Sequence, residues 1–88
     1  MPWRVRFEKN AQKDLARLGT VDRQRVARFI KDRLVDGDDP RDVGEPLAGP
    51  LRGYWKYRVG DCRIVARIED AVVTVVVVRI GNRREVYR

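Results

Sequence analysis

The sequence predicts an α+β fold in which a hairpin of two helices packs on one antiparallel-rich sheet, in the order β-α-α-β-β-β. Three observations support this prediction. A short alternating run opens the chain, two apolar stripes at helical spacing follow, and three strand-like runs fill the second half. A chain of 88 residues can bury one modest core, so we expect a single domain over residues 1–88.

The N-terminal half predicts one strand and two helices. Residues 3–7 alternate apolar and basic side chains, as in a half-buried strand. A first helix should follow and end at Gly19, and Thr20 is placed to cap a second one. The apolar residues of the first helix are Ala11, Leu15 and Leu18. Those of the second are Val26, Phe29, Ile30 and Leu34.

The C-terminal half predicts three strands after a loop. Residues 40–53 contain repeated glycine and proline, which indicates a loop with little regular structure. Strands are expected over 54–59 and 62–69, because Gly60-Asp61 between them suits a type II′ hairpin turn. The run 72–80 is β-branched at nearly every position, which predicts a strand covered on both faces and central in its sheet.

This turn fixes the register of the hairpin, with Val59 opposite Cys62 and Arg58 opposite Arg63. Cross-strand partners share a face and successive residues alternate between faces. One face should therefore belong to the core and consist of Trp55, Tyr57, Val59, Cys62, Ile64 and Ala66. The opposite face should carry Tyr54, Lys56, Arg58, Arg63, Val65 and Arg67.

The pairing of Arg58 with Arg63 disfavours folding, since like charges directly opposite one another cost a few tenths to about 1 kcal/mol. Two interpretations are open. In the first, the face is solvated and its arginines extend into water or pair with Glu69 or Glu85. In the second, the face binds phosphates, and its charges are neutralised only when a partner is present.

The charge of the chain favours a polyanionic partner. The net charge is +7 and the pI is about 10.3, and basic surfaces bind phosphates by releasing counterions. Nucleic acid is favoured over a membrane, because no long basic amphipathic helix with exposed aromatics is present. No apolar run reaches the roughly 18–20 residues that span a bilayer.

The composition also restricts the chemistry. There is no histidine and a single cysteine, Cys62, so neither a zinc site nor histidine acid–base catalysis is expected. We expect no metal and no cofactor, and any reaction must use lysine, arginine, tyrosine and carboxylates. One unpaired cysteine suits a reducing compartment, so we expect a cytoplasmic protein.

Several segments together resemble RelE-like toxins of the RelE/ParE superfamily. The matching segments are 3–18, Pro46-Leu47-Ala48-Gly49, the run from Gly53 through Val65, and the run from Arg79 through Tyr87. The resemblance implies a RelE-like fold and the toxin of a type II toxin–antitoxin system. It also implies a ribosome-dependent endoribonuclease that cleaves mRNA in the ribosomal A site, by attack of the 2′-hydroxyl and without metal. The implied partners are the ribosome with its mRNA and a cognate RelB-like antitoxin, in a hetero-oligomer that binds operator DNA through the antitoxin.

The resemblance also assigns residues. The implied catalytic residues are Lys56, Arg58, Arg63, Arg83 and Tyr87. The implied RNA-binding residues are Tyr54, Arg67 and Arg84. Which of Lys56 and Tyr87 transfers the proton stays open, as does which of Arg83 and Arg84 faces the site.

Two features depart from the family pattern, and one alternative function remains. Some relatives carry lysine where Arg58 stands, and an arginine can bind or stabilise but not transfer a proton. Several relatives also continue into a C-terminal helix beyond the position of Arg88. The alternative is a ParE-like toxin that inhibits DNA gyrase by binding, a branch in which the five implied catalytic residues are generally not retained as a group.

Overall fold

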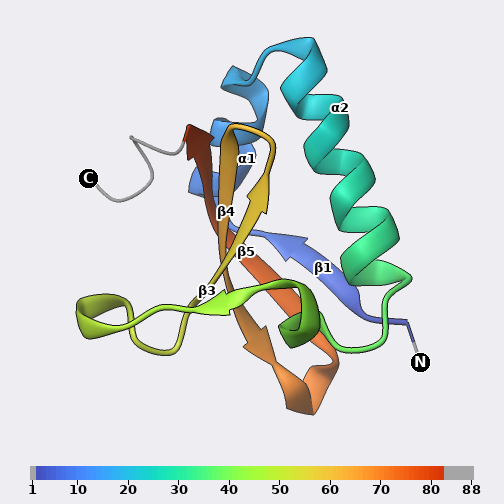
Figure 1. The fold of residues 1–88 in the computed structure, drawn as a ribbon, viewed down its shortest axis with the longest axis vertical. Coiled ribbons are helices and arrows are strands. Elements are labelled where there is room, and N and C mark those ends of the chain that lie inside the picture. The colour runs from blue at the N-terminus through green and yellow to red at the C-terminus, as the bar shows by residue number, and fades with distance from the viewer. Residues whose placement is uncertain (1, 83–88) are drawn as a thin grey trace.

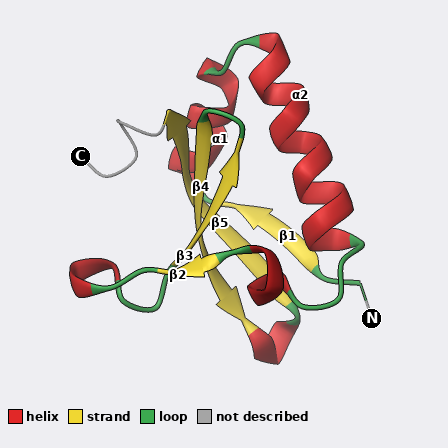
Figure 2. Ribbon diagram, viewed as in Figure 1, coloured by secondary structure: helices red, strands yellow, loops and turns green. Residues whose placement is uncertain are grey.

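The computed structural model describes residues 2–82, and the elements follow the predicted order with one additional strand (Figure 2). The strands are β1 (Arg4–Phe7), β2 (Glu45–Pro46), β3 (Trp55–Val59), β4 (Cys62–Glu69) and β5 (Thr74–Asn82). The helices are α1 (Lys9–Arg17) and α2 (Thr20–Phe29), the second continued by a π-helical segment, Ile30–Val35. Short 3₁₀ turns occupy Pro40–Val43, Gly49–Leu51 and Asp70–Val72. No helix in this part of the chain is long and apolar enough to cross a membrane.

The five strands form one mixed sheet in the order β1-β5-β4-β3-β2 (Figure 1). β1 runs parallel to β5, and all other neighbours are antiparallel. Residues of both helices belong to a single core cluster with one face of the sheet. We call the opposite face the open face because neither helix belongs to a core cluster with it, although Arg63, Val65 and Val76 on it are buried. The α+β prediction is confirmed, and β5 lies between two strands, as its β-branched sequence predicts.

The predicted hairpin register is confirmed pair by pair, from Val59 opposite Cys62 to Trp55 opposite Ala66. Gly60 has φ 60°, whereas Asp61 is not among the described non-glycine residues with positive φ, as a type II′ turn requires. The predicted core face is buried except at Trp55, which is half-buried and packs against the core. Tyr57, Ile64 and Ala66 are 0% exposed.

Three sequence predictions need correction. The segment 40–53 is not simply a loop, because β2 within it pairs with β3 and places Glu45 opposite Lys56. Thr20 does not cap α2. The N-cap is Gly19, and no side chain caps the helix. β5 begins at Thr74 and not at residue 72, because Val73 has φ 48°, a left-handed conformation that no regular strand contains.

Tyr57 fastens the segment before β2 to the sheet. Its buried hydroxyl donates a 2.9 Å hydrogen bond to the carbonyl oxygen of Pro40. Gly44 lies close to the ring, where a Cβ would be only 2.6 Å from a ring carbon. The ring also packs against Phe29 of α2, with centroids 5.8 Å apart. One side chain thus joins the helical layer, the sheet and the segment that carries Glu45.

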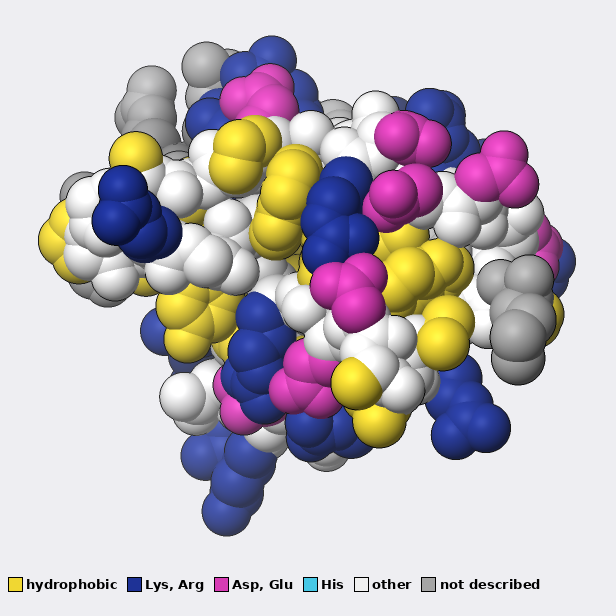
Figure 3. Space-filling view, turned by 90° about the horizontal axis from the view of Figure 1, so that it is seen from below, with side chains coloured by type: hydrophobic (Ala, Val, Ile, Leu, Met, Phe, Trp, Pro, Cys, Tyr) yellow, Lys and Arg dark blue, Asp and Glu magenta, His cyan; other side chains and the backbone are white. Residues whose placement is uncertain are grey.

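Ion pairs fasten the same segment at a second point. Arg41 donates hydrogen bonds of 3.0 and 2.6 Å to the Asp70 carboxylate, and its guanidinium carbon is 6.0 Å from the Trp55 ring centroid. The Arg41 guanidinium lowers the pKa of the Asp70 carboxyl group. Basic and acidic side chains lie next to one another in this way on the face shown in Figure 3.

Tyr57→Phe should reduce the free energy of unfolding by about 1–3 kcal/mol at neutral pH, because the buried Pro40 carbonyl loses its donor. Burial raises the pKa of Tyr57 from 10.0 to about 12. Between these values the folded protein keeps a proton that the unfolded chain has lost, so stability falls as pH rises. Urea unfolding should show Tyr57→Phe losing less stability than wild type between pH 10 and 12. If the free energy of unfolding instead changes with pH in the same way in wild type and in Tyr57→Phe, the Tyr57 pKa does not differ between the folded and unfolded states.

Candidate RNA-binding site

The open face of the β3–β4 hairpin brings three predicted site residues together. Lys56, Arg58 and Arg63 line one hollow of about 110 Å³. The other residues lining it are Val43, Gly44 and Glu45, which precede or begin β2. Arg58 and Arg63 are direct cross-strand partners, so two guanidinium groups project from the same point of the sheet.

The two arginines differ in burial. Arg58 is exposed, whereas Arg63 is only 8% exposed. The first interpretation from the sequence, a solvated face, would hold both arginines in water. It is wrong for Arg63, which is buried. A charged side chain is seldom buried unless its surroundings supply polar partners, and Arg63 is therefore held in place and not splayed into solvent.

Glu45 is the functional candidate that sequence reasoning missed. Its Oε2 atom lies 3.4 Å from Nζ of Lys56, in an ion pair between β2 and β3. The Glu45 side chain is 74% exposed and that of Lys56 is 28% exposed, so the pair contributes at most about 1 kcal/mol and can open when a ligand enters. A signal was present in the sequence, since Glu45 directly precedes the family motif at Pro46, but a two-residue strand has no periodicity to detect.

The remaining predicted site residues lie elsewhere. Tyr54 is half-buried and does not line the hollow. Arg67 shares the open face, but its guanidinium is in ion pairs with Glu8 at 3.5 Å and Glu69 at 3.1 Å. The other three predicted residues, Arg83, Arg84 and Tyr87, lie outside the described residues.

Cys62 is not a candidate nucleophile. It lies on the core face and is 3% exposed. Burial, followed by the negative charges of Asp22 and Asp61, raises the pKa of its thiol, so the reactive thiolate is disfavoured.

Comparison with known proteins places the chain in a family. A family model described as "ParE toxin of type II toxin-antitoxin system, parDE" matches residues 5–87. The chain is a RelE/ParE toxin. It is 36% identical to toxin RelG of Mycobacterium tuberculosis over 88 residues, which is 100% of this chain and 99% of RelG. It is 31% identical to toxin RelE of the same organism over 87 residues, covering 99% of this chain and 88% of that toxin.

Solved structures agree with this assignment. The structure superposes with a TM-score of 0.86 on a chain of the RelBE2 toxin–antitoxin complex from M. tuberculosis, at 35% identity over 94% of this chain and 100% of that one. The isolated RelE toxin of Escherichia coli shares the fold, with a TM-score of 0.74 at 24% identity over 97% of this chain and 90% of that one. The predicted RelE-like fold is therefore confirmed.

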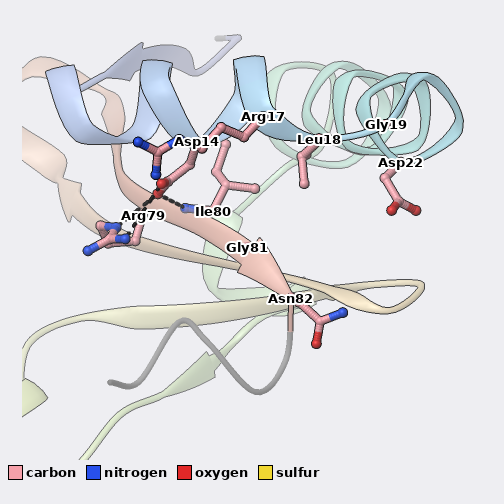
Figure 4. A pocket seen from close by; sticks show the side chains of 9 residues that line it. All are labelled: Asp14, Arg17, Leu18, Gly19, Asp22, Arg79, Ile80, Gly81 and Asn82. Carbon is pink, nitrogen blue, oxygen red and sulfur yellow. Dashed lines mark hydrogen bonds and ion pairs between the residues drawn. The ribbon is translucent and has the colours of Figure 1, made fainter.

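A second hollow, of about 260 Å³, lies where β5 of the toxin extends beyond β1 (Figure 4). The residues lining it are Asp14, Arg17, Leu18, Gly19, Asp22, Arg79, Ile80, Gly81 and Asn82. Asp14 accepts hydrogen bonds from Nε of Arg79 at 2.8 Å and from the backbone N–H of Ile80 at 2.9 Å. A carboxylate from α1 thus takes the place of a strand neighbour at the edge of β5.

Asp14→Ala should reduce the free energy of unfolding by about 2–3 kcal/mol, because it removes a charged acceptor and leaves the Ile80 N–H without its partner. Asp22→Ala is the matched control, since Asp22 lines the same hollow and makes none of the ion pairs found among residues 2–82. That change should stay within about 0.5 kcal/mol of wild type in urea unfolding. Equal losses in the two variants would mean that Asp14 does not hold the edge of β5.

Proposed function

We propose that this toxin is a ribosome-dependent endoribonuclease that cleaves mRNA in the ribosomal A site, without a metal. One observation carries the proposal: Lys56, Arg58 and Arg63 gather around a single hollow on the open face, with a carboxylate at its wall. The hairpin register places these three residues on one face of the sheet, and the family resemblance independently assigns them to the site.

The residues suit a substrate that carries its own nucleophile. The 2′-hydroxyl of RNA can attack the adjacent phosphate, so the protein needs only to align the two groups and to manage charge and protons. Arg58 and Arg63 present planar, two-pronged donors from neighbouring strands. They would bind the scissile phosphate and stabilise the negative charge of its transition state.

Glu45 and Lys56 form a natural acid–base pair for this reaction. The Glu45 carboxylate would accept the proton of the 2′-hydroxyl as its oxygen bonds to phosphorus. The Lys56 ammonium would donate a proton to the 5′-oxygen as the phosphorus–oxygen bond breaks. The products are a 2′,3′-cyclic phosphate and a 5′-hydroxyl. By the resemblance, Arg83 and Tyr87 would complete the site, and Tyr54, Arg67 and Arg84 would contact the flanking RNA.

The proposal extends to the partners of the toxin. RelBE2 of M. tuberculosis is a toxin–antitoxin complex, and its superposition on this structure supports a RelB-like antitoxin here. An antitoxin that silences the enzyme would cover the face of Arg58 and Arg63. We expect the complex to be cytoplasmic, as a hetero-oligomer that binds operator DNA through the antitoxin.

Inhibition of DNA gyrase is the second candidate function, because the family model that matches the chain is that of the ParE toxin. Both activities can be assayed with one preparation. In a translation extract programmed with a defined mRNA, primer extension should reveal cleavage only when ribosomes are present, and gyrase supercoiling should be unaffected. Intact mRNA together with blocked supercoiling would replace the nuclease proposal with the gyrase one.

Two substitutions test the acid–base pair. Lys56→Arg keeps the charge and Glu45→Gln keeps the shape, but each removes a side chain that can donate or accept a proton. Each should reduce the single-turnover cleavage rate on saturated ribosomes by roughly 10²–10⁴, with little change in ribosome affinity.

The matched controls are Lys13→Arg on α1 and Asp22→Asn on α2, both away from the hollow. They should cleave at the wild-type rate. If Glu45→Gln also cleaves at that rate while Lys56→Arg is slow, the carboxylate only orients the lysine. If both variants are fully active, Tyr87 becomes the candidate for proton transfer.

A further inference from the structure

The exposed side of α2 carries a second basic surface, separate from the candidate site. A hollow of about 300 Å³ lies between α2, its π-helical extension and the end of β3. Its lining residues are Arg25, Arg28, Phe29, Asp32, Arg33 and Val59. We call this surface the arginine groove.

The three arginines of the groove are available to a ligand. Arg25, Arg28 and Arg33 are all exposed. The ion pairs formed within residues 2–82 involve Lys31, Arg41, Lys56, Arg67 and Arg79 as the basic partners, and none of the groove arginines. Asp32 supplies one negative charge, so the groove remains strongly positive.

The groove continues the basic surface of the candidate site around the tip of the hairpin. Arg25 lies over the turn, with its guanidinium 3.3 Å from where a Cβ of Gly60 would stand. Val59 lines the groove, and its neighbour Arg58 points from the opposite face of β3 into the candidate site. A polyanion held at the candidate site would therefore meet Arg25 next.

The geometry favours a phosphate backbone over an apolar peptide anchor. Phe29, the aromatic residue that lines the groove, packs against Tyr57 with ring centroids 5.8 Å apart. It therefore cannot move aside to form a pocket for an apolar side chain. All three cations are arginines, whose planar donors match phosphate oxygens in pairs. Arg25 and Arg33 are separated by roughly 11–12 Å of helix axis, enough to meet more than one phosphate of a strand.

We propose that the arginine groove is a second RNA-binding surface, which holds the sugar–phosphate backbone of the folded RNA that surrounds the cleaved strand. The proposal rests on the proposed ribosome-dependent function and explains how the Lys56/Arg58/Arg63 hollow is kept over its target. The groove supplies affinity, and the Lys56/Arg58/Arg63 hollow supplies the reaction.

The test measures binding of purified 30S ribosomal subunits over a range of salt concentrations. The groove variant is R25Q/R28Q/R33Q. Its matched control is K9Q/K13Q/R17Q, which removes three exposed charges from α1. Each lost phosphate contact lowers the slope of log Kd against log salt by about 0.7–0.9, so the groove variant should be shallower than wild type by roughly 2–3. The control should stay close to wild type.

Further readouts separate the outcomes. R25K/R28K/R33K keeps the charges and should recover most of the slope, which excludes a folding defect as the cause. On saturated ribosomes the groove variant should still cleave mRNA at the wild-type rate.

Equal slopes for the groove variant and the α1 control would overturn the proposal, since net charge alone would then set binding. A groove variant that binds subunits as wild type does, yet loses affinity for poly-L-glutamate, would assign the groove to an acidic protein. Wild-type protein that binds no subunits would refute the proposed function itself.

Discussion

The hydrogen bond from Tyr57 to the Pro40 carbonyl is the contact on which the arrangement of this toxin depends. Residue 57 lies in the middle of β3, so its ring is held by the core on the helical face. Because strand residues alternate between faces, fixing Tyr57 inward fixes Lys56 and Arg58 outward. The same hydroxyl fixes the start of the segment that ends in β2, which brings Glu45 opposite Lys56. A one-residue shift of β3 would move the site residues into the core and the tyrosine into water.

This dependence explains why like charges can lie opposite one another in the sheet. The cost of the Arg58–Arg63 pair is small beside the stability gained from burying Tyr57, Ile64 and Ala66 on the other face of the same two strands. The core can therefore hold a cluster of cations that the open face alone would not favour. The arginine groove on α2 extends this cluster without disturbing the core, because its arginines are on the exposed side of the helix.

The register and the two faces of the hairpin could be predicted from the sequence because they depend only on residues close together in the chain. A two-residue turn beginning with Gly60 sets the register, and the alternation of side chains then assigns both faces. The parts that could not be predicted depend on contacts between distant residues. β2 exists only because β3 lies beside it, and Asp14 takes its role only because β1 ends before β5 does. The burial of Arg63 likewise depends on its tertiary surroundings, which include the segment 43–45 beside it, and no residue spacing in the sequence predicts it.

We propose that the open face of β3 and β4 binds the scissile phosphate. The most direct test is a cryo-EM structure of the toxin on a bacterial 70S ribosome, with an mRNA whose A-site 2′-hydroxyls are methylated to prevent cleavage. We expect the scissile phosphate within hydrogen-bonding distance of Arg58 and Arg63, with the methylated 2′-oxygen beside Glu45. An mRNA strand bound against α1 or α2 instead, with the hollow of Lys56, Arg58 and Arg63 facing away from it, would show that the open face does not bind the scissile phosphate.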